Sequence, residues 1–143
     1  MRKILLLVTA LFIICSCSMD DGGDPQFHVE ILPVSSITNM PRFITPGRTY
    51  DLKAIYQKPT SCHTLGKFYD EKEANIITMW LQTVVVDDPE CENEVNPMVM
   101  EEATYTFKCP STYQASTCVF RFYSGNDNYG NPIYIEDEVP VRY

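Results

Sequence analysis

The alternation of apolar and polar residues along this chain is that of short β-strands. At its first occurrence Phe27, Val29 and Ile31 share one face, with His28 and Glu30 on the other. A period of two residues places successive side chains on opposite faces of a strand. Further segments of this kind predict strands at residues 50–57, 64–69, 99–109, 117–123 and 133–141.

Residues 76–86 differ, because they are apolar on both faces and rich in β-branched residues. Such a run is typical of a central strand, and it predicts that Trp80 lies in the core. A helix is the alternative, but the three consecutive valines at residues 84–86 disfavour it. Charged residues at 70–73 predict a turn before this strand, and prolines interrupt the segment between residues 33 and 46.

Seven or eight short strands with no convincing helix predict an all-β fold. Two antiparallel sheets packed face to face bury the apolar face of every strand, so we expect a β-sandwich. The strands extend from residue 26 to residue 143, which is enough chain for one domain. No internal repeat or second domain is visible in the sequence.

The first 16 residues predict a secretory signal peptide. A basic head, Arg2 and Lys3, precedes the apolar stretch at residues 4–14, which is too short to span a bilayer as a mature helix. Cleavage before Cys17 places the small residue Ser16 in the narrow pocket of the peptidase, whereas cleavage before Cys15 would place Ile14 there.

The residues from Ile14 to Cys17 resemble the lipobox of bacterial lipoproteins, although Cys15 stands where Ala, Ser or Thr is more usual. The resemblance implies that Cys17 is lipidated and that the chain is exported and anchored to the outer membrane, on its periplasmic or cell-surface side. Two or three acyl chains suffice for a stable anchor. The alternative is an ordinary signal peptide cut elsewhere, with Cys17 a plain thiol.

Residues 17–25 are polar, acidic and glycine-containing, which predicts a flexible tether. They look like the acidic export signal of Bacteroidetes-type surface lipoproteins, and a solvated linker explains the same residues. The strand layout, with Cys62 and Cys91 and the closing strand at residues 138–142, looks like the small immunoglobulin-like domains of such lipoproteins. That resemblance implies an immunoglobulin-like sandwich and leaves the function open.

Charge excludes some classes of partner. Without Arg2 and Lys3 the mature chain has nine basic residues against 19 acidic ones, a net charge near −10. Such a chain repels the phosphates of nucleic acids, and it repels anionic lipid as well. We therefore expect no nucleic-acid partner, and membrane attachment through the lipid anchor alone.

Four cysteines remain in the domain, and an even number in an exported chain predicts two disulfides. Of the three possible pairings we favour Cys62–Cys91 and Cys109–Cys118, because the second pair flanks a short turn-like stretch. Zinc is the rival interpretation, but the chain has no CxxC motif and only two histidines. We expect no metal and no cofactor.

The sequence shows no catalytic constellation. Cys62 beside His63 is the one pair that suggests a nucleophile next to a base. A disulfide at Cys62 removes that nucleophile. Calcium is a weaker alternative, because acidic residues crowd two loops but do not follow the EF-hand spacing. The acidic residues concerned are Asp87, Asp88, Glu90, Glu92, Glu94 and Asp127.

We therefore expect a non-enzymatic, tethered interaction module that binds a protein or glycan partner at the envelope. Tyr123, Tyr129 and Tyr134 lie near the last predicted hairpin and form a possible binding surface, since exposed tyrosines stack on sugars and anchor protein partners. A carbohydrate-binding accessory protein using these tyrosines is the main alternative. A small hydrolase or inhibitor using the acidic loops is a third.

Overall fold

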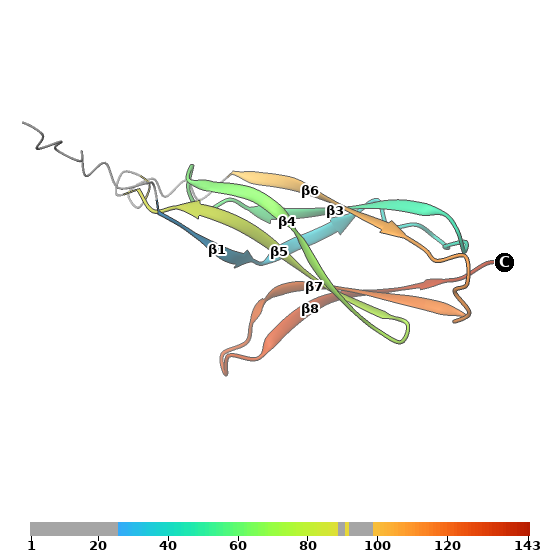
Figure 1. Cartoon of the computed structure of the whole chain (residues 1–143). Coiled ribbons are helices and arrows are strands. Elements are labelled where there is room, and N and C mark those ends of the chain that lie inside the picture. Colours follow the sequence, from blue (N-terminus) through green and yellow to red (C-terminus); the bar gives the residue numbers. More distant parts are fainter. Residues whose placement is uncertain (1–25, 89–90, 92–98) are drawn as a thin grey trace, which may run out of the picture.

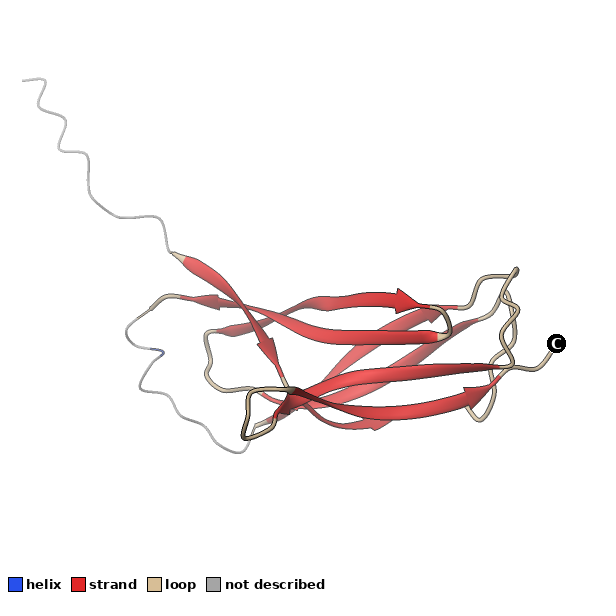
Figure 2. Cartoon of the chain, turned by 90° about the horizontal axis from the view of Figure 1, so that it is seen from below, coloured by secondary structure: helices blue, strands red, loops and turns tan. Residues whose placement is uncertain are grey.

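The computed structural model describes residues 26–88, 91 and 99–143. The predicted signal peptide, Cys17 and the tether lie outside these residues. Figure 2 shows a body built of strands joined by loops. The eight strands are β1 (Phe27–Leu32), β2 (Val34–Thr38), β3 (Thr49–Gln57), β4 (His63–Glu73), β5 (Ile76–Val86), β6 (Met100–Lys108), β7 (Thr117–Asn126) and β8 (Pro132–Pro140).

The strands form two sheets, which confirms the predicted all-β sandwich (Figure 1). β3 is the central strand of a three-stranded sheet, between β2 and β6. β5 is central to a five-stranded sheet, as its apolar sequence predicts. One edge of β5 pairs with β4, and the other pairs with β1 over residues 81–86 and with β7 over residues 76–79. The β5–β7 pair is parallel, whereas the other strand pairs are antiparallel.

The core lies between the sheets and consists of alternate residues from their inner faces. Aromatic rings meet across it: Phe107 of β6 contacts Phe120 of β7 edge-on, with ring centroids 5.2 Å apart. Tyr105 of β6 contacts Phe68 of β4 in the same manner at 5.6 Å. Edge-on pairs of this kind add to the stabilisation that burial itself gives. The largest fully buried side chains also include Tyr56, Phe122, Ile44, Leu52, Met79 and Leu81.

Two elements differ from the sequence prediction. Strand β2, which pairs with β3, was not predicted, because Pro33 and a run of small polar residues conceal it. The charged turn at residues 70–73 was also wrong: these residues continue β4, paired with β5 as far as Glu73 and Ile76. The turn follows at Ala74 and Asn75, and Ala74 adopts a left-handed conformation with φ of 54°.

Trp80 does not lie in the core, contrary to the prediction. The odd-numbered residues of β5 from Ile77 to Val85 are buried, so Trp80 belongs to the opposite, outer face. There it is half-buried and packs against Tyr69 of β4, with ring centroids 5.6 Å apart. A strand that is apolar on both faces does not indicate which face meets the other sheet.

The disulfide prediction is half right. Cys62 and Cys91 are bonded, which links the start of β4 to the loop after β5. Cys109 and Cys118 are free cysteines, so the second predicted bond is not present. Both side chains are buried in the core, and burial raises the pKa of both thiols. The thiol of Cys109 donates a hydrogen bond to the backbone oxygen of Pro110.

Candidate functional site

The polarity of strand β1 is reversed relative to the core. The apolar residues of its first five positions point outward: Phe27, Val29 and Ile31 are 70%, 58% and 40% exposed, whereas Leu32 at its end is buried in the core. Its polar residues His28 and Glu30 lie opposite Val85 and Thr83 of β5, both buried. Directly opposed residues of an antiparallel pair share a face, so His28 and Glu30 occupy the inner side of the sheet. The side chains of His28 and Glu30 are 48% and 43% exposed there, so the informative exception is the exposed apolar row.

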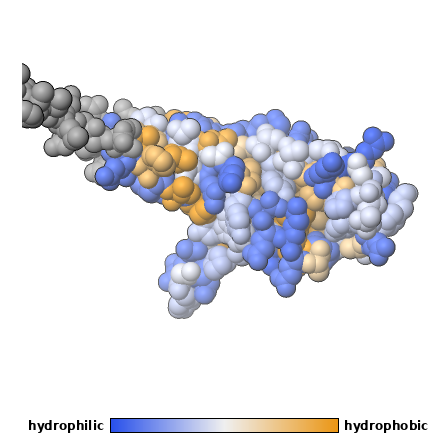
Figure 3. Space-filling model, in the orientation of Figure 1, coloured by the Kyte–Doolittle hydropathy of each residue, from blue (hydrophilic) through white to orange (hydrophobic). Residues whose placement is uncertain are grey.

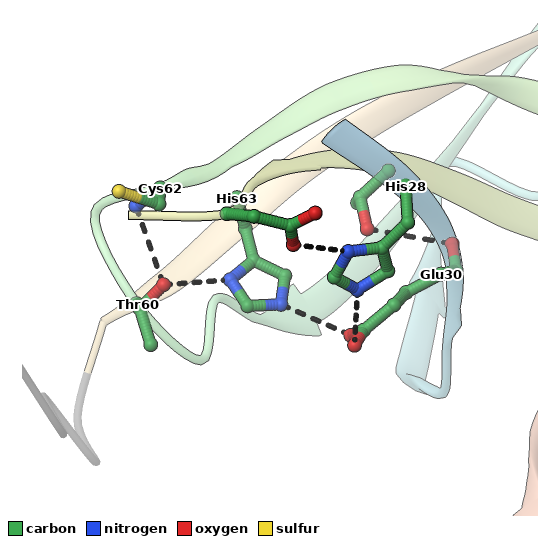
Figure 4. Close-up of polar contacts among 7 residues, drawn as sticks. His28, Glu30, Thr60, Cys62 and His63 are labelled. Atoms are coloured by element: carbon green, nitrogen blue, oxygen red, sulfur yellow. Dashed lines mark hydrogen bonds and ion pairs between the residues drawn. The ribbon is translucent and has the colours of Figure 1, made fainter. Parts of the chain in front are cut away.

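On this inner side the chain's two histidines converge on one carboxylate (Figure 4). Nε2 of His28 lies 3.1 Å from one oxygen of Glu30, and Nε2 of His63 lies 3.1 Å from the other. The second nitrogen of each ring is also held: Nδ1 of His28 lies 2.7 Å from Asp87, and Nδ1 of His63 lies 2.8 Å from the hydroxyl of Thr60. We call these five residues the histidine cluster.

The partners of His28 determine its charge. Both are carboxylates, which only accept hydrogen bonds when ionised, so both contacts are hydrogen bonds at once only while His28 is an imidazolium. The hydrogen bonds to Glu30 and Asp87 accordingly raise the pKa of His28. The hydrogen bond to His28, and to a smaller extent the one to His63, lowers the pKa of Glu30.

His63 has a hydrogen-bond partner at each ring nitrogen. Its Nε2 contacts Glu30, and its Nδ1 contacts the hydroxyl of Thr60. That hydroxyl oxygen also accepts the backbone N–H of Cys62, which fixes the turn at the start of β4. The His63 side chain is only 8% exposed, so it forms the floor of the cluster.

The histidine cluster lines a cavity of about 200 Å³. The rest of its wall is formed by Val85, Val86, Asp88 and the disulfide cysteine Cys91. With three carboxylates and one imidazolium the cavity is negative, so it suits a cation or a hydrogen-bond donor better than an anion. Its described lining contains no serine and no free thiol, and its one hydroxyl group is that of Thr60, which is hydrogen-bonded to Nδ1 of His63. The pairing of His63 with Glu30 was not predicted, and the only sequence signal was that two isolated histidines both adjoin predicted strands.

The outer side of β1 is an apolar surface. Figure 3 shows apolar residues gathered over β1 and the adjoining part of β5. Val84 and Val86 of β5 lie opposite Val29 and Phe27 and extend this surface. Beside it lies a groove of about 290 Å³ between Val29 and the β4 residues Gly66 and Lys67.

Gly66 is required where this groove meets the β-bulge of β4. A Cβ atom there would lie 2.8 Å from the backbone oxygen of Gln82, closer than real Cβ atoms approach. Glycine therefore permits the close approach of β4 to β5 at the bulge.

Strand β1 also has an open edge. Within the described part of the chain it pairs only with β5. The backbone groups directed away from β5 therefore have no strand partner among these residues. An edge of this kind is a template for another strand, and proteins usually protect it with charges, proline or a covering loop.

The three predicted surface tyrosines are only partly brought together. Tyr123 and Tyr134 are cross-strand neighbours and contact each other at 6.4 Å, but their planes are inclined by 70°. Tyr129 is 90% exposed and lies in the turn between β7 and β8, which projects from the body in Figure 1. The Tyr123–Tyr134 pair is therefore not the flat platform on which a sugar ring stacks.

Two of the acidic side chains considered as calcium ligands, Asp87 and Asp127, have hydrogen-bond partners within the protein. Asp127 accepts the backbone N–H groups of Tyr129 and Asn131 and the amide of Asn131, and these bonds lower its pKa. Asp87 binds His28. Glu90, Glu92 and Glu94 lie outside the described residues. In the described ranges, no three His, Cys, Asp or Glu side chains are grouped to hold a metal ion.

Comparison with known proteins gives no family for this chain. No protein-family model matches it, and neither the curated proteins nor the solved structures contain a match. None of the residues that the structure describes forms a helix long and apolar enough to span a membrane.

Proposed function

We propose that this chain is an exported, lipid-anchored interaction module that binds a partner protein through strand β1. The observation that carries the proposal is the reversed polarity of β1. Phe27, Val29 and Ile31 form an exposed apolar row on a strand whose other edge is open in the described structure. Export and the anchor are supported by the signal-like residues 1–16 and by Cys17.

A partner that adds a strand to β1 fits both features. Its backbone pairs with the open edge, and its alternate apolar side chains cover the apolar row beside them. Its other face adjoins the inner side of β1, where Glu30 and Asp87 are held by His28 and the cavity is negative. A lysine or arginine on that face complements the charge. The proposed ligand is therefore an extended protein segment that is apolar on one face and basic on the other.

The proposal is tested by photocrosslinking in cells of the native host. A benzoylphenylalanine is introduced at Phe27 in the full-length, membrane-anchored chain, and at the fully exposed Tyr129 as the control. We expect a discrete adduct from Phe27 and none of the same size from Tyr129. Adding Val29→Lys and Ile31→Lys should abolish the adduct without unfolding the domain, because both side chains are exposed.

Two outcomes contradict the proposal. One is the same set of adducts from both positions. The other is an adduct that survives the two lysine substitutions. The anchor is tested separately: Cys17→Ala should release the protein from the membrane fraction, and persistent membrane association would rule out the lipid anchor.

A further inference from the structure

We propose that the histidine cluster is a proton-dependent latch that holds β1 in place for its partner. The inference deepens the proposed function, on which its biological meaning rests. The latch connects three elements: His28 and Glu30 belong to β1, His63 begins β4, and Asp87 follows β5. These side-chain bonds add to the backbone pairing of β1 with β5, to the burial of Leu32 at its end and to the hydrogen bond from Thr83 to the backbone of Glu30.

The latch needs the proton because of the chemistry of its acceptors. His28 bridges two carboxylates, so loss of either ring proton leaves a nitrogen lone pair facing a carboxylate oxygen. The groups that face His28 are Glu30 on its own strand, and Asp87 and Asp88 from the loop after β5. His63 of β4 reaches it through Glu30. The surrounding carboxylates favour the cation, and a neutral His28 gives up one of its two attachments.

The direction of the pH dependence follows from this arrangement. The folded-state pKa of His28 is raised above its ordinary value of 6.5. Its contribution to stability is therefore complete below the unfolded pKa and is lost as pH rises through the folded pKa. Below the His28 titration and above the lowered pKa of Glu30, β1 is fastened and its open edge is ordered for pairing. At more alkaline pH the end of β1 loosens, so a partner must order it on binding and affinity falls.

The sharpest test is Asp87→Asn in the purified full-length chain. The new amide donates to Nδ1, while the Nε2–H of a neutral ring still donates to Glu30, so the latch no longer needs a second proton on His28. Ring NMR signals of His28 are followed across pH together with amide hydrogen exchange in β1, corrected for the intrinsic pH dependence of exchange. Peptides from β3 report on the core, and Asp137→Asn on the exposed part of β8 is the matched control.

In the wild type and in Asp137→Asn we expect His28 to titrate with a midpoint above 6.5, and protection of β1, but not of β3, to be lost over the same interval. In Asp87→Asn the midpoint should move down, and β1 should stay protected at the higher pH. If that variant does not fold, His28→Gln provides the test, because it should remove the pH dependence of β1 altogether. Exchange in β1 that is independent of pH in the wild type, or loss of protection that is unchanged in either variant, would overturn the latch.

These measurements use the free protein, so they can reject the latch without rejecting the proposed binding function. A pH-independent β1 in a protein that still yields the Phe27 adduct rejects the latch alone. A titrating β1 without any specific adduct rejects the binding function alone. If both hold, the yield of the adduct should fall as pH rises through the His28 titration, and it should not fall in Asp87→Asn.

Discussion

Replacing both cysteines of the Cys62–Cys91 disulfide with alanine is predicted to lower the melting temperature by about 14 °C. The bond closes a loop with a sequence separation of 29 residues. In the chain-entropy model such a loop restricts the unfolded state by about 3.6 kcal/mol at 25 °C. A domain of about 118 residues has an unfolding entropy near 0.25 kcal/mol/K, which converts this free energy into the predicted shift.

The assay is thermal unfolding followed by circular dichroism, on the wild type and on Cys62→Ala/Cys91→Ala, each with and without dithiothreitol. The reductant should bring the wild type down to the melting temperature of the variant and leave the variant unchanged, since Cys109 and Cys118 are already thiols. This internal control separates loss of the cross-link from side effects of the substitutions.

A drop of less than about 4 °C in the variant, corresponding to roughly 1 kcal/mol, would refute the reasoning. It would mean that the unfolded chain is already restricted at this loop. A further fall of the variant in dithiothreitol would instead mean that a second disulfide exists, contrary to the free state of Cys109 and Cys118.

Three further predictions concern other parts of the domain. In a chain without Cys15 and Cys17, alkylation without reductant should label no thiol quickly in the native state and two thiols after unfolding. The reason is that Cys109 and Cys118 are buried and their pKa values are raised. Rapid labelling of the native protein would contradict this. Gly66→Ala should destabilise the domain by about 1–3 kcal/mol in urea titration, because its Cβ would meet the backbone of Gln82, whereas Lys67→Ala should cost little. The folded-state pKa of Asp127 is lowered, so its contribution is present above the ordinary value of 3.8 and is lost as pH falls through the lowered pKa. The amide signals of Tyr129 and Asn131 should shift with a midpoint below 3.8, and a midpoint at or above that value would argue against the turn.

The strands were predictable where one face is continuously buried. In β3 and β6, Leu52, Ala54, Ala103 and Phe107 alternate with exposed polar residues, and both strands lie within one or two residues of their predicted bounds. β2 was not predictable, because Ser35 and Ser36 replace the apolar alternation and Pro33 adjoins them. Its pairing with β3 depends on tertiary contact rather than on local pattern.

The candidate site was far less predictable, because it depends on register. His28 and His63 are 35 positions apart in the sequence, and they meet only because both pair with Val85 from opposite edges of β5. A shift of one residue in either pairing would turn one histidine to the other face of the sheet. Spacing in the sequence contains no information about such a coincidence.

Reversed polarity in β1 also explains why its binding surface and its latch belong together. Exposing Phe27, Val29 and Ile31 forgoes burial energy on the order of 3 kcal/mol, given their exposed fractions and about 1.5–3 kcal/mol for each fully buried side chain. In the proposed latch, His28 supplies an additional attachment on the opposite face. A partner that covers the apolar row recovers this energy, which is worth about a hundredfold in affinity at 1.4 kcal/mol per factor of ten. In the proposed function, the exposed apolar row supplies the driving force for binding, and His28 holds the strand until binding occurs.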